Sequence, residues 1–345
     1  MYDAHYDLLG YVYQALKKDI ESMKSYTKEV FTDNIEGGIL NMPYLSALEM
    51  SDIGIETNEL DVSIMVKAIV DAINNHHLLP NKENFIYGIE GCDYLKSVEE
   101  LDTLYKLGIR SIAPVWNSPN QFGSGGRGEH GLTKLGKELI FKAAELNMVI
   151  DVSHANDATF WDIIACIKEL KAKGKKTILI ASHSNCRELF SNETHEFQTK
   201  YLAKQIEPNF YKRNLNDEQL LAVKECDGLV GIVLHKLLSK PSLDKTSVLE
   251  PKLDQMFLDA LVNQFNHLRK LFNGVEHIMV STDNMQLKAD VDIYYNHCNH
   301  FDQRHVKQEL NNLLLQNGYT EKEVEKIMSL NFKDKILAKI TDFSH

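Results

Sequence analysis

Short apolar runs alternate along this chain with longer stretches whose apolar positions recur at helical spacing. Some of the short runs, such as residues 148–154 and 177–183, are almost continuously apolar, as is typical of parallel strands covered on both faces. The pattern predicts eight strands, at residues 2–7, 38–45, 85–90, 111–116, 148–154, 177–183, 229–235 and 277–283.

Helical spacing marks most of the stretches between these strands. The predicted helices cover residues 9–30, 59–76, 132–146, 157–173, 216–226 and 251–272. Asn156 and Asn216 are expected to begin two of them as N-caps, and Gly174 and Gly274 to end two. Eight strands alternating with helices predict an α/β fold, a (β/α)8 TIM-type barrel; a doubly wound parallel sheet is the alternative.

The chain is expected to form a single barrel domain over residues 1–345, because no linker or internal repeat divides it. A polar, irregular stretch at about residues 188–212 predicts a long insertion after the sixth strand. Such loops commonly serve the mouth of a site or an interface. From about residue 304 the pattern indicates a C-terminal helical tail.

Composition narrows the class of protein. Acidic residues outnumber basic ones, 49 to 38, and no basic stripe is present, so no nucleic-acid partner is expected. The five cysteines are never spaced as CxxC, which fits a reducing compartment and argues against a cysteine-ligated zinc site. Without a signal peptide or a membrane-spanning apolar run, the expected location is cytoplasmic, with no membrane partner; a homodimer is an open alternative.

Residues of metal-binding type end five of the eight predicted strands. His5 and Asp7 lie two apart on the first strand, so both side chains project from the same face. The third, fifth, sixth and eighth strands end in Glu90, His154, His183 and Asp283. In a barrel these positions converge on one rim, where the active sites of this fold are built.

Three histidines and two carboxylates at such a rim suit zinc or a similar divalent ion. Five ligands are too many for one open site. They fit two ions that share a carboxylate and hold a bridging hydroxide for hydrolysis, with Asp283 left over as a proton carrier. A lone histidine at a strand end is more often structural, so it is the coincidence at five strand ends that favours a metal-dependent hydrolase.

The order of these motifs resembles the membrane (renal) dipeptidase family from His5 to about residue 337. The motifs that carry the resemblance are His5-x-Asp7, Gly-Ile-Glu90-Gly, the segment from Gly131 to His154, Ala-Ser-His183-Ser-Asn, Arg213-Asn-Leu-Asn-Asp-Glu-Gln and Asn331-Phe. The family would make this chain a binuclear zinc dipeptidase acting on dipeptides.

The resemblance also implies roles for single residues. One zinc ion would be held by His5, Asp7 and Glu90, and a second by Glu90, His154 and His183, with Glu90 and a hydroxide as bridges. Asp283 would be the acid/base residue, and Arg213 would bind the free carboxylate of the dipeptide.

Three residues depart from the family pattern. Trp116 stands where the family carries a histidine thought to polarise the scissile carbonyl, Asn284 follows Asp283 where a phenylalanine is usual, and His235 replaces an aromatic residue. All three are candidates to line a reshaped substrate pocket, with slower turnover or an altered substrate preference. The alternatives are a tryptophan that caps the barrel core, a solvent-facing asparagine and a histidine satisfied by the backbone.

Two other functions stay open at this point. An amidohydrolase-type deaminase or lactonase would use the same rim chemistry, but such enzymes usually begin with HxH and often bridge their metals through a modified lysine. A catalytically weak metal-binding protein of the same fold is suggested by Trp116, although loss of catalysis would give no reason to retain five ligands.

Overall fold

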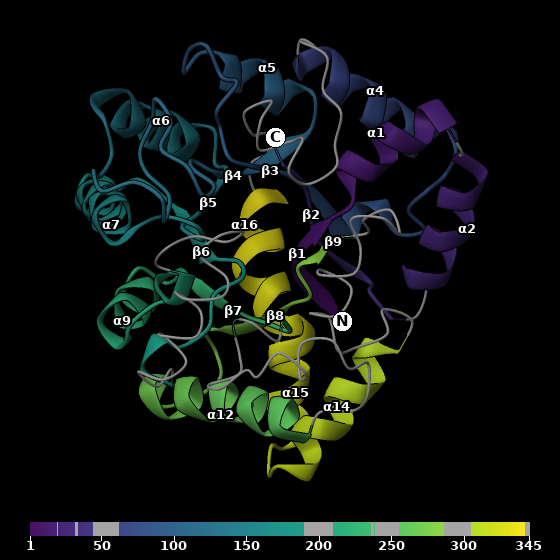
Figure 1. The fold of residues 1–345 in the computed structure, drawn as a ribbon, viewed down its shortest axis with the longest axis vertical. Coiled ribbons are helices and arrows are strands. Elements are labelled where there is room, and N and C mark those ends of the chain that lie inside the picture. The colour runs from purple at the N-terminus through teal and green to yellow at the C-terminus, as the bar shows by residue number, and fades with distance from the viewer. Residues whose placement is uncertain are drawn as a thin grey trace.

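Eight parallel strands close into a barrel in this computed structural model, which describes residues 1–18, 20–31, 34–43, 62–189, 210–235, 238, 255–285 and 305–341 (Figure 1). Neighbouring strands pair in parallel, and β1 pairs with both β8 and β2, which closes the ring and confirms the predicted TIM-type barrel. The strands are β1 (Tyr2–Asp7), β2 (Gly37–Pro43), β3 (Phe85–Glu90), β4 (Ile109–Ala113), β5 (Val149–Asp151), β6 (Ile178–Ala181), β7 (Leu229–Val233) and β8 (Ile278–Ser281).

Helices surround the ring of strands (Figure 1). They are α1 (Leu9–Lys18), α2 (Ile20–Val30), α4 (Val62–Asn75), α5 (Glu100–Lys106), α6 (Lys134–Glu145), α7 (Asp157–Ala172), α9 (Asp217–Glu225), α12 (Gln255–Phe272) and α14 (Val306–Gln316). The described residues include the short 3₁₀ turns η1 (Lys82–Asn84), η2 (Arg187–Leu189) and η4 (Phe210–Arg213). Among the helices in the described ranges, none combines the length and the apolar character needed to cross a bilayer.

The structure corrects several predicted boundaries. Two helices, α1 and α2, lie where a single helix was expected at 9–30. The prediction joined them because both have apolar residues at helical spacing. The seven-residue α5 and the two-residue β9 (Asn284–Met285), which pairs with β1, were not predicted because they are too short to show a period. Most of the predicted insertion, residues 190–209, lies outside the described residues.

The predicted helix ends are confirmed at the level of single hydrogen bonds. The Asn156 side chain accepts a hydrogen bond from the backbone N–H of Thr159 at 2.8 Å and begins α7. Asn216 begins α9 in a capping box with Gln219. Gly174 follows α7 with a φ of +71°, a left-handed conformation that glycine adopts without a Cβ clash. The two N-caps fix where the loops that follow β5 and β6 at the barrel rim end, whereas Gly174 ends α7 at the opposite end of the barrel.

The last part of the chain packs against the amino-terminal end of the barrel. After α15 (Glu321–Glu325), two π-helical turns (Lys326–Leu330 and Lys333–Leu337) lead into α16 (Ala338–Thr341), which crosses the middle of the ring in Figure 1. Phe332 and Ile336 belong to one buried cluster with Tyr2, Ile178 and Leu229, which are the first residues of their strands. The segment therefore closes the amino-terminal end of the barrel.

Candidate metal centre

A β-bulge in β1 turns the His5–Asp7 pair toward the barrel interior. Tyr2 and Ala4 pack in the interior cluster, whereas Tyr6 belongs to the outer core between strands and helices. Between these positions the register with β2 shifts, at residues Asp3 to Tyr6. A bulge adds one residue to the alternation of faces, so His5 and Asp7 point inward although the inward positions before them are even-numbered.

The strand-end ligands meet around one carboxylate oxygen. Glu90 ends β3, and its Oε1 lies 3.4 Å from His5 Nε2, 2.9 Å from His154 Nε2 and 3.3 Å from His183 Nε2. Asp7 Oδ1 lies 3.4 Å from His5 Nε2. The structure thus brings the five predicted ligands together, and all five side chains are buried.

Two groups of three ligands share Glu90. His5, Asp7 and Glu90 form one, and Glu90, His154 and His183 form the other; within each group the ligand atoms lie within 4.8 Å of one another. Among the described residues, the buried atoms His5 Nε2, Asp7 Oδ1 and Glu90 Oε1 have no hydrogen-bond partner. Buried polar atoms rarely stay unpartnered, and imidazole with carboxylate is a donor set suited to zinc, so these residues fit two bridged cations.

The hydrogen bonds of His154 prepare it as a ligand. Arg213 Nη2 can only donate and faces Nε2, so Nε2 keeps its lone pair and the ring proton sits on Nδ1, 2.8 Å from Asn117 Oδ1. Arg213 Nη2 donates to that lone pair at 2.8 Å. Burial, and next the Arg213 charge, lowers the pKa of His154 to about 3, so the ring is neutral at pH 7.

The electrostatics of the cluster favour a cation at its centre. Burial by itself would lower the pKa of His5, but the carboxylates of Glu90 and Asp7 outweigh it and raise that pKa well above its usual value. Burial would raise the pKa of Glu90, yet His5 holds it well below its usual range. The carboxylates therefore draw positive charge into a buried space.

Asp283 lies beside the ligands and differs from them in exposure. Its Oδ1 is 4.0 Å from His5 Nε2, and its side chain is 20% exposed, against 5% or less for His5, Asp7 and Glu90. Burial raises the pKa of Asp283 to about 7 against the attraction of His5, and Asp7 and Glu90 add to the increase. Its φ of +48° is left-handed, as is the +69° of His154, and such conformations cluster at functional sites.

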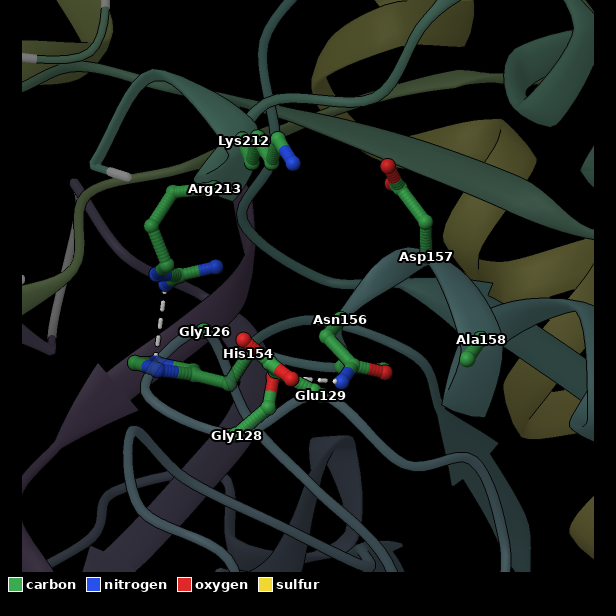
Figure 2. A pocket seen from close by; sticks show the side chains of 10 residues that line it. Gly126, Gly128, Glu129, His154, Asn156, Asp157, Ala158, Lys212 and Arg213 are labelled. Atoms are coloured by element: carbon green, nitrogen blue, oxygen red, sulfur yellow. Dashed lines mark hydrogen bonds between the residues drawn. The ribbon is translucent and has the colours of Figure 1, made fainter. Parts of the chain in front are cut away.

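A cavity of about 320 Å³ opens beside the cluster (Figure 2). In the figure Arg213 and Lys212 lie on one side of it and Asn156 and Asp157 on the other, with Arg213 joined to His154 by a hydrogen bond. The remaining lining residues are Gly126, Gly128, Glu129, Ala155 and Ala158. Arg213 thus stands between the predicted ligands and a space of substrate size.

The three residues that depart from the family pattern lie in different surroundings. The Trp116 ring packs beside His154, with 5.6 Å between ring centroids. Asn284 is buried and its Nδ2 donates to the Tyr6 hydroxyl at 2.7 Å, so the solvent-facing alternative is wrong. His235 is also buried, and its Nδ1 has no hydrogen-bond partner in the described ranges. Burial, and next Arg213, lowers the pKa of His235 to about 4.

Sequence reasoning missed the residues that hold the histidines from behind. Besides Asn117, they include Asn41, Asp151 and Ser182, whose side chains form hydrogen bonds in and around the cluster. Their signal was present in the sequence, because Asp151 and Ser182 lie inside the Asp-Val-Ser-His and Ala-Ser-His motifs.

A parallel (β/α)8 barrel with histidines and carboxylates converging at its carboxyl-terminal rim has the architecture of a metal-dependent hydrolase. The sequence model of the membrane dipeptidase family (peptidase family M19) matches residues 55–344, and the chain belongs to this family. The match begins after β1, so the place of His5 and Asp7 in the site rests on the geometry.

Individual proteins are similar to parts or all of the chain. An uncharacterized dipeptidase of Schizosaccharomyces pombe is 26% identical over 204 residues, 57% of this chain and 40% of that protein. An uncharacterized protein from the PQQ-III 3′ region of Acinetobacter calcoaceticus is 33% identical over 153 residues, 42% of this chain and 40% of that protein. The chain thus spans about two fifths of the length of these curated relatives. A Rhodobacter sphaeroides metallo peptidase, solved with a phosphinate mimic of the dipeptide L-Ala-D-Ala, shares the fold with a TM-score of 0.68 at 18% identity, over 99% of this chain and 98% of its own.

Proposed function

We propose that this chain is a binuclear zinc dipeptidase. The observation that carries the proposal is the arrangement of three histidine Nε2 atoms around one oxygen of Glu90. His5 and Asp7 would hold one ion, His154 and His183 the other, and Glu90 both. When bound, two such ions would lower the pKa of a water molecule so that hydroxide is available near neutral pH, and would stabilise the charge that develops on the carbonyl oxygen.

Two side chains do the remaining work on the substrate. Asp283, next to the cluster and partly exposed, takes the proton of the attacking water and delivers it to the departing amine. Arg213 borders the cavity and binds the free carboxylate of the dipeptide, which requires it to turn from His154 toward the substrate. Membership of the dipeptidase family supports this assignment over a deaminase or a lactonase.

Trp116 is the reason to expect slow hydrolysis of simple dipeptides. An oxyanion donor in such a site contributes about 2.7 to 4 kcal/mol to the transition state. Trp116 offers only an indole N–H, and its ring packs on His154. We therefore propose slow turnover of simple dipeptides and a pocket shaped for a different side chain or acyl group, to which His235 contributes. Asn284 bonds to the Tyr6 hydroxyl and is not among the residues that line the described cavity.

Metal content and a dipeptide panel test the proposed function together. We expect close to two zinc ions per chain by elemental analysis, and dipeptide hydrolysis that a chelator removes and zinc restores. Turnover should lie below the roughly 10 per second typical of enzymes. At most one ion per chain after zinc reconstitution would contradict the binuclear site. Hydrolysis of lactones or deamination of amines without dipeptide cleavage would contradict the substrate class.

Replacing Arg213 by alanine is expected to weaken the use of substrates with a free carboxylate. Losing one partner of a desolvated charge pair typically costs about 2 to 5 kcal/mol, so kcat/KM should fall at least about 30-fold. The control is the same dipeptide as its C-terminal amide, measured with both proteins. Wild type should prefer the free acid strongly, and Arg213→Ala should lose that preference; equal hydrolysis of acid and amide by the wild type would contradict carboxylate recognition.

The cellular setting stays a prediction. The described cysteines, Cys92, Cys166, Cys186 and Cys226, are buried and free of disulfides, which supports the reducing, cytoplasmic location expected from their spacing. A homodimer is the other open expectation.

A further inference from the structure

One hydroxyl group touches both metal-ligand groups from behind. Ser182 Oγ lies 2.7 Å from Nδ1 of His183 and 3.1 Å from Nδ1 of His5. It also forms a short hydrogen bond to Asp151 Oδ2. The ligand atoms of His5, Asp151 and His183 also lie within 4.8 Å of one another, but the Ser182 hydroxyl contacts all three residues. All four side chains are buried.

The direction of the Ser182 proton follows from Asp151. An ionised carboxylate only accepts hydrogen bonds. Asp151 Oδ1 already accepts the backbone N–H groups of Ser153 and Ser182, each at 3.0 Å, so Oδ2 is the oxygen that receives the Ser182 hydroxyl proton. The two lone pairs of Ser182 Oγ are then left to accept. The Nδ1 atoms of His183 and His5 face them at 2.7 and 3.1 Å, and the Ser153 hydroxyl is more distant, at 3.3 Å.

This arrangement selects the tautomer of each ring. When its ring is neutral, a histidine that donates from Nδ1 has its lone pair on Nε2, which is the atom that faces Glu90 in both residues. In His183 the competing position for the proton is Nε2, which lies 2.9 Å from Nε2 of His154. His5 has a second neighbour at Nδ1, since Asn41 Nδ2 lies 2.8 Å away. If His5 Nδ1 carries the proton, Asn41 must face it with its amide oxygen rather than its amide nitrogen. A 180° rotation of the Asn41 amide exchanges these two similar atoms. His183 depends on Ser182 more than His5 does.

We propose that Ser182, oriented by Asp151, is a positioning residue that fixes the Nδ1–H tautomer of His5 and His183 and thereby prepares one ligand in each metal group. The inference rests on the proposed function in that it takes both groups to bind zinc. The Ser182 hydroxyl would then link the two metal-ligand groups from behind, through one histidine of each, without itself being a metal ligand.

Zinc affinity measured by chelator competition tests this role. Removing such an outer hydrogen-bond partner typically weakens metal binding about 10- to 100-fold. We expect Ser182→Ala to show a loss of that size at the group containing His183 and a smaller loss at the group containing His5. Ser184→Ala is the matched control, because Ser184 lies in the same segment, is equally buried, and its hydroxyl has no partner among the described residues. Its zinc affinity should equal that of wild type.

Asp151→Asn separates proton direction from mere packing. The amide oxygen must stay with the two backbone N–H groups, so the amide N–H faces Ser182 Oγ and turns the hydroxyl proton toward a histidine. The expected result is a larger loss of zinc affinity than in Ser182→Ala, although a hydroxyl remains. An affinity in Asp151→Asn equal to wild type would overturn the proposed proton direction.

Nitrogen NMR of the imidazole groups reads the tautomer directly in the metal-free wild type. We expect Nδ1 of His183 to be protonated before zinc is added, and Ser182→Ala to show a mixture of tautomers. Protonation at Nε2 in the wild type, or wild-type zinc affinity in Ser182→Ala, overturns the positioning role alone. A wild type that binds no zinc overturns the proposed function.

Discussion

Replacing Glu90 by glutamine is expected to remove both zinc ions and to abolish dipeptide hydrolysis. Glu90 Oε1 belongs to both ligand groups, and glutamine keeps its shape while it loses the charge that the buried cations need. Elemental analysis should fall from close to two zinc ions per chain to nearly none. This is the largest effect expected of any single change in the protein.

The matched control for Glu90→Gln is Asp7→Asn, another carboxylate-to-amide exchange. Asp7 belongs to only one of the groups that contain Glu90, so this variant should keep close to one zinc ion. If Glu90→Gln retained two ions, Glu90 would not be the shared ligand. If Asp7→Asn lost both, the two groups would not fill independently.

Replacing Asp283 by asparagine is expected to lower kcat on the order of 100-fold or more while zinc content stays unchanged. Asparagine cannot take the proton of the attacking water. It is the right replacement here because Asp283 has a φ of +48°, a left-handed conformation that asparagine adopts more readily than alanine. The measurement is kcat with saturating dipeptide, paired with zinc analysis of the same sample.

A second aspartate provides the control for Asp283→Asn. Asp227 has a similar φ of +55° but precedes β7 at the other end of the barrel, where it pairs with Lys335 and Lys339. Asp227→Asn should leave kcat unchanged. Near-native kcat in Asp283→Asn would remove Asp283 from the proton-transfer role, and a loss of zinc would make it a ligand instead.

Much of the fold could be predicted because its signals are local. Near-continuous apolar runs followed by helical spacing indicate covered parallel strands, and eight of them predict a barrel. The ligands could be found because this fold places strand ends at one rim, so His154 and His183 were recognisable without a structure. In both cases, however, the strand ends earlier than predicted, at Asp151 and Ala181, and the ligand lies in the turn that follows.

The other features of the site depend on where side chains point in the folded protein, which the order of residues alone does not show. His5 and Asp7 face the interior because the register of β1 shifts, and no residue in this segment predicts that shift. That Asn117 and Ser182 choose the tautomers of the histidines depends on where short polar side chains point after the chain has folded. The contact between Arg213 and His154 crosses from one loop to another and could not be inferred from either sequence segment.

The packing of Phe332 and Ile336 against the amino-terminal end of the barrel has a consequence for how the chain folds. Phe332 stacks near Tyr2 of the first strand, with ring centroids 5.5 Å apart, so the interior is completed by residues from opposite ends of the sequence. Contacts of such long sequence separation form slowly and leave apolar surface uncovered in intermediates. During synthesis, a nascent chain that has not reached Ile336 presents an open ring of apolar side chains, and at that stage aggregation or chaperone binding competes with folding.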